Sequence, residues 1–220
     1  MRVGRSRDEI ARRAARDIPE GWYVNLGIGI PLLVASNLPA GNAEIIFHSE
    51  NGILGVGPAP SPEQVDPWLI NAGKQPITIL PGASFCHQAD SFAIIRGGHL
   101  DLCMLGAFQV AENGDIANWT TSLDDRTPAI GGAMDLAVGA RRVWVLMEHV
   151  TRDGRPRLVR HCDLPLTATG VVERVYTNLG VFDVTERGFR VREIVDGFDF
   201  AAVQNLTDAK LISIDEQKRA

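Results

Sequence analysis

The sequence contains few cysteines and few histidines. Its 220 residues include three cysteines that lie far apart, Cys86, Cys103 and Cys162. An odd number at this spacing argues against a disulfide framework. The five histidines are also dispersed, without the close pairing that a zinc site on a helix requires. We therefore expect no disulfide and no bound metal.

The sequence also lacks a basic excess and a long apolar run. It has 22 Lys and Arg against 27 Asp and Glu, which gives a net charge of −5 and leaves no basic surface for nucleic acid. The first twenty residues are too charged for a signal peptide, and no later run is long enough to span a membrane. We expect a soluble, cytoplasmic protein that binds neither nucleic acid nor membrane.

The composition does provide enough apolar residues for a substantial core. Apolar residues make up 45% of the chain, and a chain of this length and composition suits one compact domain. No internal repeat, low-complexity tract or clear linker divides it. We therefore expect a single domain over residues 1–220.

The order of the apolar patterns predicts an α/β fold. Ser6 to Glu9 has the pattern of a capping box, and apolar residues then recur at helical spacing as far as Ile18. The segment 22–31 reads as a strand that enters a glycine turn, followed by a short helix and a second strand over 43–48. This β-α-β order would deliver Glu50 to the carboxyl end of the second strand.

Further strands extend this pattern toward the C-terminus. Continuous apolar runs at 77–80, 102–105 and 143–147 are typical of strands buried on both faces of a parallel sheet. Three short alternating runs between 171 and 194 predict a small antiparallel meander. We expect a three-layer αβα fold with a mostly parallel central sheet and this meander at its end.

The segment "HSENGILGVG" places one carboxylate, Glu50, between an apolar strand and several glycines. A carboxylate at the end of a buried strand is costly unless N–H groups or a ligand compensate it. The glycines allow sharp turns and close approach of a ligand to the main chain. Glu50 is thus either a reactive group or a structural carboxylate bonded to a turn or a helix N-terminus.

Two pairs of glycines could present backbone N–H groups to an anion. Gly27 and Gly29 follow a strand and precede a helix, which also suits a dinucleotide phosphate. The third glycine of that fingerprint is absent, and Pro31 removes an N–H, so a nicotinamide enzyme is a weak alternative. Gly131 and Gly132 stand at the start of another predicted helix, where tight packing would explain them equally well.

The segment 85–110 is rich in polar side chains that could contact a substrate, among them His87, Ser91, Arg96 and His99. A Ser-His-Asp hydrolase is a conceivable interpretation, but Ser91 lacks the Gly-x-Ser-x-Gly elbow that would expose its hydroxyl. Arg96 could anchor an acidic substrate or simply be a surface residue.

Taken together, these segments resemble the B-type (beta) subunit of the family I CoA-transferases that act on 3-oxo acids, from about residue 6 to the C-terminal region. The Ser-Glu-Asn-Gly signature of that family is matched by residues 49–52. Other shared tracts follow in the same order: "LINAGKQ", "ADSF", "LGAFQV", "GDIANW" and "GGAMDLA". The chain is most similar to the 3-oxoadipate branch, although Cys86 replaces an aromatic residue that is more common there.

The resemblance implies a CoA-transferase/NagB-like fold and a reaction in which Glu50 carries a glutamyl-CoA thioester. Coenzyme A would be substrate and covalent intermediate, with no permanently bound cofactor. The implied catalytic residues also include Asn51 and the main-chain N–H groups of Gly131 and Gly132. The implied CoA-lining residues are Gly27, Ile28, Gly29 and Asn118. His87 and Arg96 are candidates for the distal carboxylate of a dicarboxylic substrate.

The resemblance also implies a partner. The glycine-rich Gly-x-Gly-Gly-Phe segment of the family's A-type (alpha) chain is absent from this sequence. We therefore expect a heteromer with an A-type partner, in which two copies of each polypeptide or more assemble. The substrates would be succinyl-CoA and a 3-oxo acid, either 3-oxoadipate or, as the alternative, acetoacetate. A non-catalytic sensor of acyl-CoA or sugar phosphates is the alternative from another class.

Overall fold

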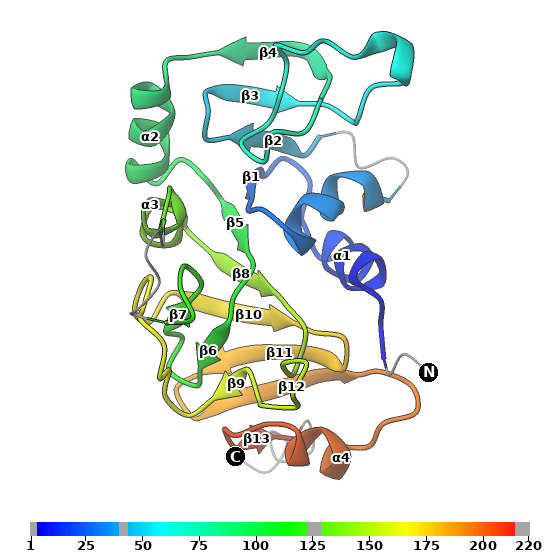
Figure 1. Ribbon diagram of the computed structural model, residues 1–220, viewed down its shortest axis with the longest axis vertical. Coiled ribbons are helices and arrows are strands. Elements are labelled where there is room, and N and C mark those ends of the chain that lie inside the picture. Colours follow the sequence, from blue (N-terminus) through cyan, green and yellow to red (C-terminus); the bar gives the residue numbers. More distant parts are fainter. Residues whose placement is uncertain (1–3, 40–43, 123–128, 214–220) are drawn as a thin grey trace.

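The computed structural model describes residues 4–39, 44–122 and 129–213, and these form an α/β fold around one ten-stranded sheet. The strand order is β13-β12-β11-β10-β8-β5-β1-β2-β3-β4 (Figure 1). The strands of this sheet in chain order are β1 (Tyr23–Leu26), β2 (Ile46–Ser49), β3 (Ile53–Val56), β4 (Ile79–Phe85), β5 (Leu102–Leu105), β8 (Val143–Leu146), β10 (Val172–Tyr176), β11 (Gly180–Thr185), β12 (Gly188–Ile194) and β13 (Leu211–Ile212).

Five neighbouring strands, β2, β1, β5, β8 and β10, are parallel and form the centre of the sheet. Every residue of β5 and β8 is buried, as the continuous apolar runs predicted. Because these strands run in the same direction, their carboxyl ends meet at one edge of the sheet. That edge is where ligands bind in open α/β sheets.

Helices cover both faces of the centre of the sheet, so the predicted α/β layering is confirmed. One face packs against α1 (Arg7–Ala15) and the 3₁₀-helix η1 (Ile30–Asn37). The other packs against α2 (Gln88–Arg96) and α3 (Ala133–Gly139). Alternate residues of β8 serve the two faces: Trp144 points into the core below α1, and Val145 into the core below α3. Figure 1 shows these helix pairs on opposite sides of the strands.

The N-terminal helix begins where its sequence predicts but ends at Ala15, before the predicted end at Ile18. Ser6 Oγ accepts a hydrogen bond from Glu9 N, and the Glu9 carboxylate accepts one from Ser6 N, which completes the capping box. Ile10 and Ala14 of this helix are fully buried. The longest α-helices of the described residues, α1 and α2, have nine residues each, whereas a bilayer-spanning helix needs about 20.

Antiparallel strands flank the parallel centre on both sides, and the end strand β13 pairs parallel with β12. The predicted meander is confirmed as β10, β11 and β12, which continue the main sheet. The run 77–80 was wrongly predicted to be a buried parallel strand. It begins at Ile79 as β4, which pairs antiparallel with β3 at the edge of the sheet and leaves Ile79 exposed. An apolar run alone does not distinguish these two environments.

Some elements had not been predicted. A second sheet has the order β7-β6-β9 and covers part of the α3 face. These elements are β6 (Gln109–Ala111), β7 (Ile116–Ala117), β9 (Leu158–Val159), the short 3₁₀-helix η2 (Pro62–Gln64) and the C-terminal helix α4 (Phe200–Asn205). The strands of the second sheet have two or three residues each, too few for an alternating pattern to show.

Candidate active site

Residues 49–52 form the tight turn between β2 and β3. Ser49 pairs with Ile53 across this hairpin, and Gly52 N donates to Ser49 O at 2.9 Å. Gly52 has a φ of 105°, and a Cβ placed on it would lie 2.2 Å from Cys86 O. Only glycine fits this position. The turn holds Glu50 at the carboxyl end of β2, as the sequence predicted.

The residues on each side of Glu50 fix the turn to the loop at 70–72. Ala72 N donates to Ser49 Oγ at 2.9 Å, and Asn51 Nδ2 donates to Ile70 O at 2.8 Å. Asn51 is exposed. Its side chain thus has a structural partner in the "LINAGKQ" tract, and the tract lies beside the turn.

The Glu50 carboxylate lies against the start of α3. A Cβ placed on Gly132 would lie 2.6 Å from Glu50 Oε2 and 3.1 Å from Phe92 Cζ, so a larger residue would displace the carboxylate. Within the described residues, Glu50 has no salt bridge. Burial, and then the negative charge of Asp135, raise the pKa of Glu50. The structure therefore brings Glu50 and Gly132 together, and no cation among the described residues forms a salt bridge with the carboxylate.

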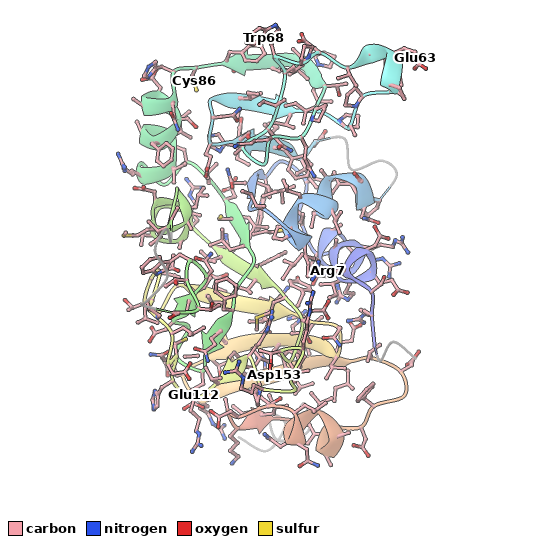
Figure 2. All side chains as sticks on the ribbon, in the orientation of Figure 1. Arg7, Glu63, Trp68, Cys86, Glu112 and Asp153 are labelled. Atoms are coloured by element: carbon pink, nitrogen blue, oxygen red, sulfur yellow. The ribbon has the colours of Figure 1, made fainter. Side chains whose placement is uncertain are left out.

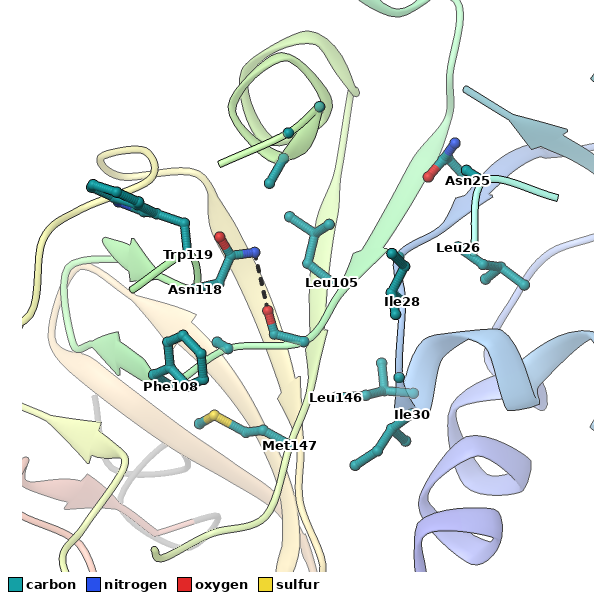
Figure 3. A pocket seen from close by; sticks show the side chains of 18 of the residues that line it. Asn25, Leu26, Ile28, Ile30, Leu105, Phe108, Asn118, Trp119, Leu146 and Met147 are labelled. Atoms are coloured by element: carbon teal, nitrogen blue, oxygen red, sulfur yellow. Dashed lines mark hydrogen bonds between the residues drawn. The ribbon is translucent and has the colours of Figure 1, made fainter. Parts of the chain in front are cut away.

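A cavity of about 530 Å³ extends from Glu50 along the carboxyl edge of the parallel strands. Figure 3 shows that apolar side chains from several strand ends line it, including Leu26, Leu105 and Leu146. Residues 131 and 132 and the predicted CoA-lining residues 27–29 and 118 also line it. Most of the predicted site thus surrounds one cavity.

The glycine turn after β1 is shaped by the neighbouring strand. Gly27 N donates to Met104 O at 2.8 Å, and a Cβ on Gly27 would lie 3.0 Å from that oxygen. This N–H is therefore not free for a dinucleotide phosphate. Gly29 has a φ of 101°, and the side chain of Ile28 between them is 71% exposed. The turn offers main chain and one apolar side chain to a ligand.

Asn118 lines the cavity but is held by protein contacts. Its Nδ2 donates to Gly106 O at 3.2 Å, the bond drawn in Figure 3, and its Oδ1 accepts from Thr167 Oγ1 at 2.7 Å. The first bond joins the segment after β7 to the segment after β5, and the second joins it to the segment before β10. Asn118 thus fixes the wall of the cavity at Gly106.

His87 and Arg96 are not among the residues that line this cavity. His87 Nδ1 accepts a hydrogen bond from Ala89 N and caps α2. Arg96 Nε donates to the Asp135 carboxylate at 2.7 Å, and its side chain is 65% exposed. Figure 2 labels Cys86, which directly precedes His87, beside the start of α2. Arg96 contacts Asp135, and the negative charge of Asp135 contributes to the raised pKa of Glu50.

A buried network of neutral groups supports the turn, and the sequence did not reveal it. His48 Nδ1 lies 3.1 Å from Asn25 Nδ2, and His48 Nε2 lies 2.8 Å from Ser91 Oγ. Because an amide NH₂ only donates, Nδ1 accepts, and Nε2 carries the proton and donates to Ser91. Burial lowers the pKa of His48 to about 4, so the ring is neutral at pH 7. Histidine here donates to the serine and cannot act as its base, which rejects the hydrolase interpretation.

Similarity to known proteins agrees with this geometry. The chain is 54% identical to the B subunit of 3-oxoadipate CoA-transferase from Acinetobacter baylyi, over 94% of this chain and 95% of that protein. It is 47% identical to the B subunit of succinyl-CoA:3-ketoacid coenzyme A transferase from Helicobacter pylori, over 93% of this chain and 97% of that protein. Both similarities extend well beyond the Ser-Glu-Asn-Gly turn.

The fold also has a match among solved structures. An acyl-CoA transferase of Escherichia coli, solved as a thioester complex with CoA, superposes with a TM-score of 0.74 at 18% identity. The match covers 98% of this chain and 43% of that enzyme, so the chain spans less than half of its length. The sequence itself matches the Coenzyme A transferase family over residues 7–205. This chain belongs to the Coenzyme A transferase family, as its motifs predicted.

Proposed function

We propose that this chain transfers CoA from succinyl-CoA to a 3-oxo acid, with 3-oxoadipate as the favoured acceptor, through a thioester on Glu50. The observation that carries the proposal is the position of Glu50. Its carboxylate lies without a salt bridge in the described residues, against Gly132, at one end of the cavity. A structural carboxylate would be expected to have a compensating partner there.

The first half of the reaction forms the enzyme thioester. The ionised carboxylate of Glu50 attacks the thioester carbonyl of succinyl-CoA, which releases CoA thiolate and leaves a succinyl-glutamyl anhydride. The thiolate then attacks the glutamyl carbonyl and expels succinate. A carboxylate needs no separate base for this attack, and its raised pKa makes it a stronger nucleophile than an ordinary carboxylate.

The second half reverses these steps with a new acid. The carboxylate of the 3-oxo acid attacks the glutamyl thioester and releases CoA thiolate. The thiolate then attacks the acyl carbonyl of the new anhydride, which yields the 3-oxoacyl-CoA and regenerates Glu50. Because one product leaves before the second substrate enters, the kinetics should be ping-pong. CoA is both substrate and intermediate, with no permanently bound cofactor.

The residues around Glu50 suit both halves of the proposed reaction. The tetrahedral intermediates carry negative charge beside the glutamyl carbonyl, where main-chain N–H groups of Gly131 and Gly132 would stabilise it, with Asn51 close in the same turn. The anhydride and the thioester must be kept from water, and Phe92 and the apolar cavity wall favour this. Gly27, Ile28, Gly29 and Asn118 would line the bound CoA.

The proposal includes an A-type (alpha) partner polypeptide. The relatives from Acinetobacter and Helicobacter are both named as B subunits, and the Escherichia coli enzyme is more than twice as long as this chain. A second polypeptide would close the open side of the cavity, and two copies of each polypeptide or more would assemble. The reaction would take place in the cytoplasm.

The acceptor acid follows from the similarity to named relatives. The relative named for 3-oxoadipate is 54% identical and the one named for 3-ketoacids 47% identical, which favours 3-oxoadipate over acetoacetate. His87 and Arg96 remain candidates for its distal carboxylate, from α2 and its N-cap beside the site. A non-catalytic acyl-CoA sensor is the alternative, but such a protein would not need an unpaired Glu50 at the end of the cavity.

The test is steady-state turnover by the chain co-expressed with its A-type partner. With succinyl-CoA as donor, we expect ping-pong kinetics and a higher kcat/KM for 3-oxoadipate than for acetoacetate. Faster transfer to acetoacetate would overturn the choice of acceptor. Tight binding of succinyl-CoA without transfer to either acid would favour the sensor.

A further inference from the structure

The end of the cavity away from Glu50 contains a half-buried cation, Arg157. Arg157 lines the cavity just before β9, and its backbone is held on both sides: its N–H donates to His149 O, and its carbonyl accepts from Val110 N. Arg157 Nε is covered and has no hydrogen-bond partner within the described residues. A covered N–H group that lacks such a bond is costly, so a ligand that accepts from it would stabilise the site.

The neighbours of Arg157 leave positive charge in excess. Burial lowers the pKa of Arg157, attraction to Glu148 raises it, and repulsion from Arg7 lowers it further. Arg7 Nε lies 3.4 Å from Glu148 Oε1, and both residues line the same cavity. Arginine stays protonated in proteins. Two guanidinium groups therefore face one carboxylate, and an added anion would balance the charge.

The position of this cation limits which anion it can hold. Glu50 follows β2 and Glu148 follows β8, with β1 and β5 between them in the sheet. Three steps of about 4.8 Å separate β2 from β8, or roughly 14 Å. A six-carbon diacid has five C–C bonds of about 1.5 Å, so it spans less than about 8 Å. The diacid thus covers only about half of the separation between these strands, so a longer ligand suits Arg157 better.

The pantetheine arm of CoA does have the required length. Roughly thirteen bonds of about 1.5 Å join the CoA sulfur to the first phosphorus, enough to cover 14 Å. We propose that Arg157, assisted by Arg7, binds a phosphate group of CoA, so that the arm crosses the ends of β1 and β5. This assignment rests on the proposed function, and it gives the two arginines a ligand with the charge and geometry that guanidinium prefers.

Calorimetric titration of the co-expressed two-chain enzyme tests the assignment without requiring turnover. Arg157→Gln should weaken CoA binding about 10- to 100-fold, the effect of losing one or two charged hydrogen bonds. Binding of pantetheine, which has no phosphate, should change less than about twofold. Dephospho-CoA shows which phosphate is held: the pyrophosphate if the loss persists with it, the 3′-phosphate if the loss disappears.

Two further variants distinguish a loss of phosphate binding from a loss of folding. Arg7 lies at the start of α1 with an exposed side chain, so Arg7→Gln should weaken CoA binding by a smaller factor than Arg157→Gln. Arg155→Gln removes the same charge two residues away, where the guanidinium is 76% exposed and bonded to Asp153, and should leave CoA affinity unchanged.

The results separate this assignment from the proposed function. Equal CoA affinity in wild type and Arg157→Gln, or an equal loss with pantetheine, would overturn the phosphate site even if transfer proceeds. A rise in KM for the acceptor acid alone would point to a carboxylate site and would also overturn it. Absence of transfer in a wild type that binds CoA in an Arg157-dependent manner would reject the function and keep the site.

Discussion

Two partly or fully buried carboxylates, Glu50 and Asp183, have opposite surroundings. Asp183 accepts hydrogen bonds from Arg174 at 2.7 Å, Arg190 at 2.6 Å and Arg192 at 3.2 Å. Burial alone would raise the pKa of Asp183, but these arginines lower it below its ordinary value. Glu50 has no such partner in the described part of the chain, and its pKa is raised.

The difference separates a structural carboxylate from the one that we propose to react. The guanidinium groups around Asp183 occupy its oxygens and join β10, β11 and β12. At Glu50, hydrogen bonds among neutral groups, His48, Asn25 and Ser91, hold the turn while the carboxylate oxygens stay available. Neutral hydrogen bonds thus fix the turn that carries Glu50, and no salt bridge within the described residues neutralises its carboxylate.

The largest expected effect comes from removing the reactive carboxylate. Glu50→Gln keeps the size of the side chain but cannot form the anhydride, so kcat for transfer should fall about 10⁴-fold or more. Steady-state assay of the two-chain enzyme measures this. Glu173→Gln, at a half-exposed glutamate paired with Arg142, is the matched control and should keep full activity. A comparable fall in kcat in both variants would show that Glu50 has no special role in transfer.

Removing the structural carboxylate should affect stability and leave the chemistry intact. Asp183→Asn leaves three guanidinium groups facing a neutral amide and should cost about 2–3 kcal/mol of unfolding free energy. This is at or below the lower limit of about 3–5 kcal/mol for a broken buried pair, because Arg190 and Arg192 still reach water. Urea unfolding measures the cost. A variant as stable as wild type would contradict the role assigned to Asp183.

A smaller effect is expected from the neutral network. Ser91→Ala leaves the Nε2–H of His48 without its acceptor and should cost about 1–2 kcal/mol of stability. Transfer should fall less than about tenfold, because Ser91 touches no reacting atom. Chemical denaturation and initial rates measure the two quantities. Loss of all transfer in this variant would revive the hydrolase-like role for Ser91.

The smallest predicted effect is a gain in stability. The raised pKa of Glu50 means that its ionisation disfavours folding, fully above that pKa and not at all below the ordinary carboxyl value near 4.5. Glu50→Gln should therefore raise the thermal midpoint at pH 7.5, by about 2–4 °C for each kcal/mol gained. The gain should vanish as the pH falls toward 4.5. Asp183→Asn should show the opposite sign at neutral pH, since the pKa of Asp183 is lowered.

The sequence predicted the features that depend on local pattern. Capping at Ser6, the buried runs of β5 and β8 and the meander each follow from residues close in sequence. The need for glycine at position 52 could be suspected from the turn, but its cause is the carbonyl oxygen of Cys86, which lies just after β4.

Features that depend on distant pairs were not predictable in the same way. His48 and Ser91 are 43 positions apart, and nothing in either segment indicates that they share a hydrogen bond. Arg157 was not singled out, because its burial becomes evident only when β6 and β9 pack beside the end of β8. The predicted residues Arg96 and His87 had polar neighbours in sequence, yet their structural partners are Asp135 and a helix N-terminus.

The central claim is that Glu50 becomes covalently bonded to CoA, and intact mass spectrometry tests it most directly. After incubation of the two-chain enzyme with succinyl-CoA, this chain should gain the mass of CoA less one water, and borohydride should remove the adduct. Glu50→Gln should never acquire it. A wild-type enzyme that transfers CoA at full rate without this adduct, or with the adduct on another residue, would contradict the account.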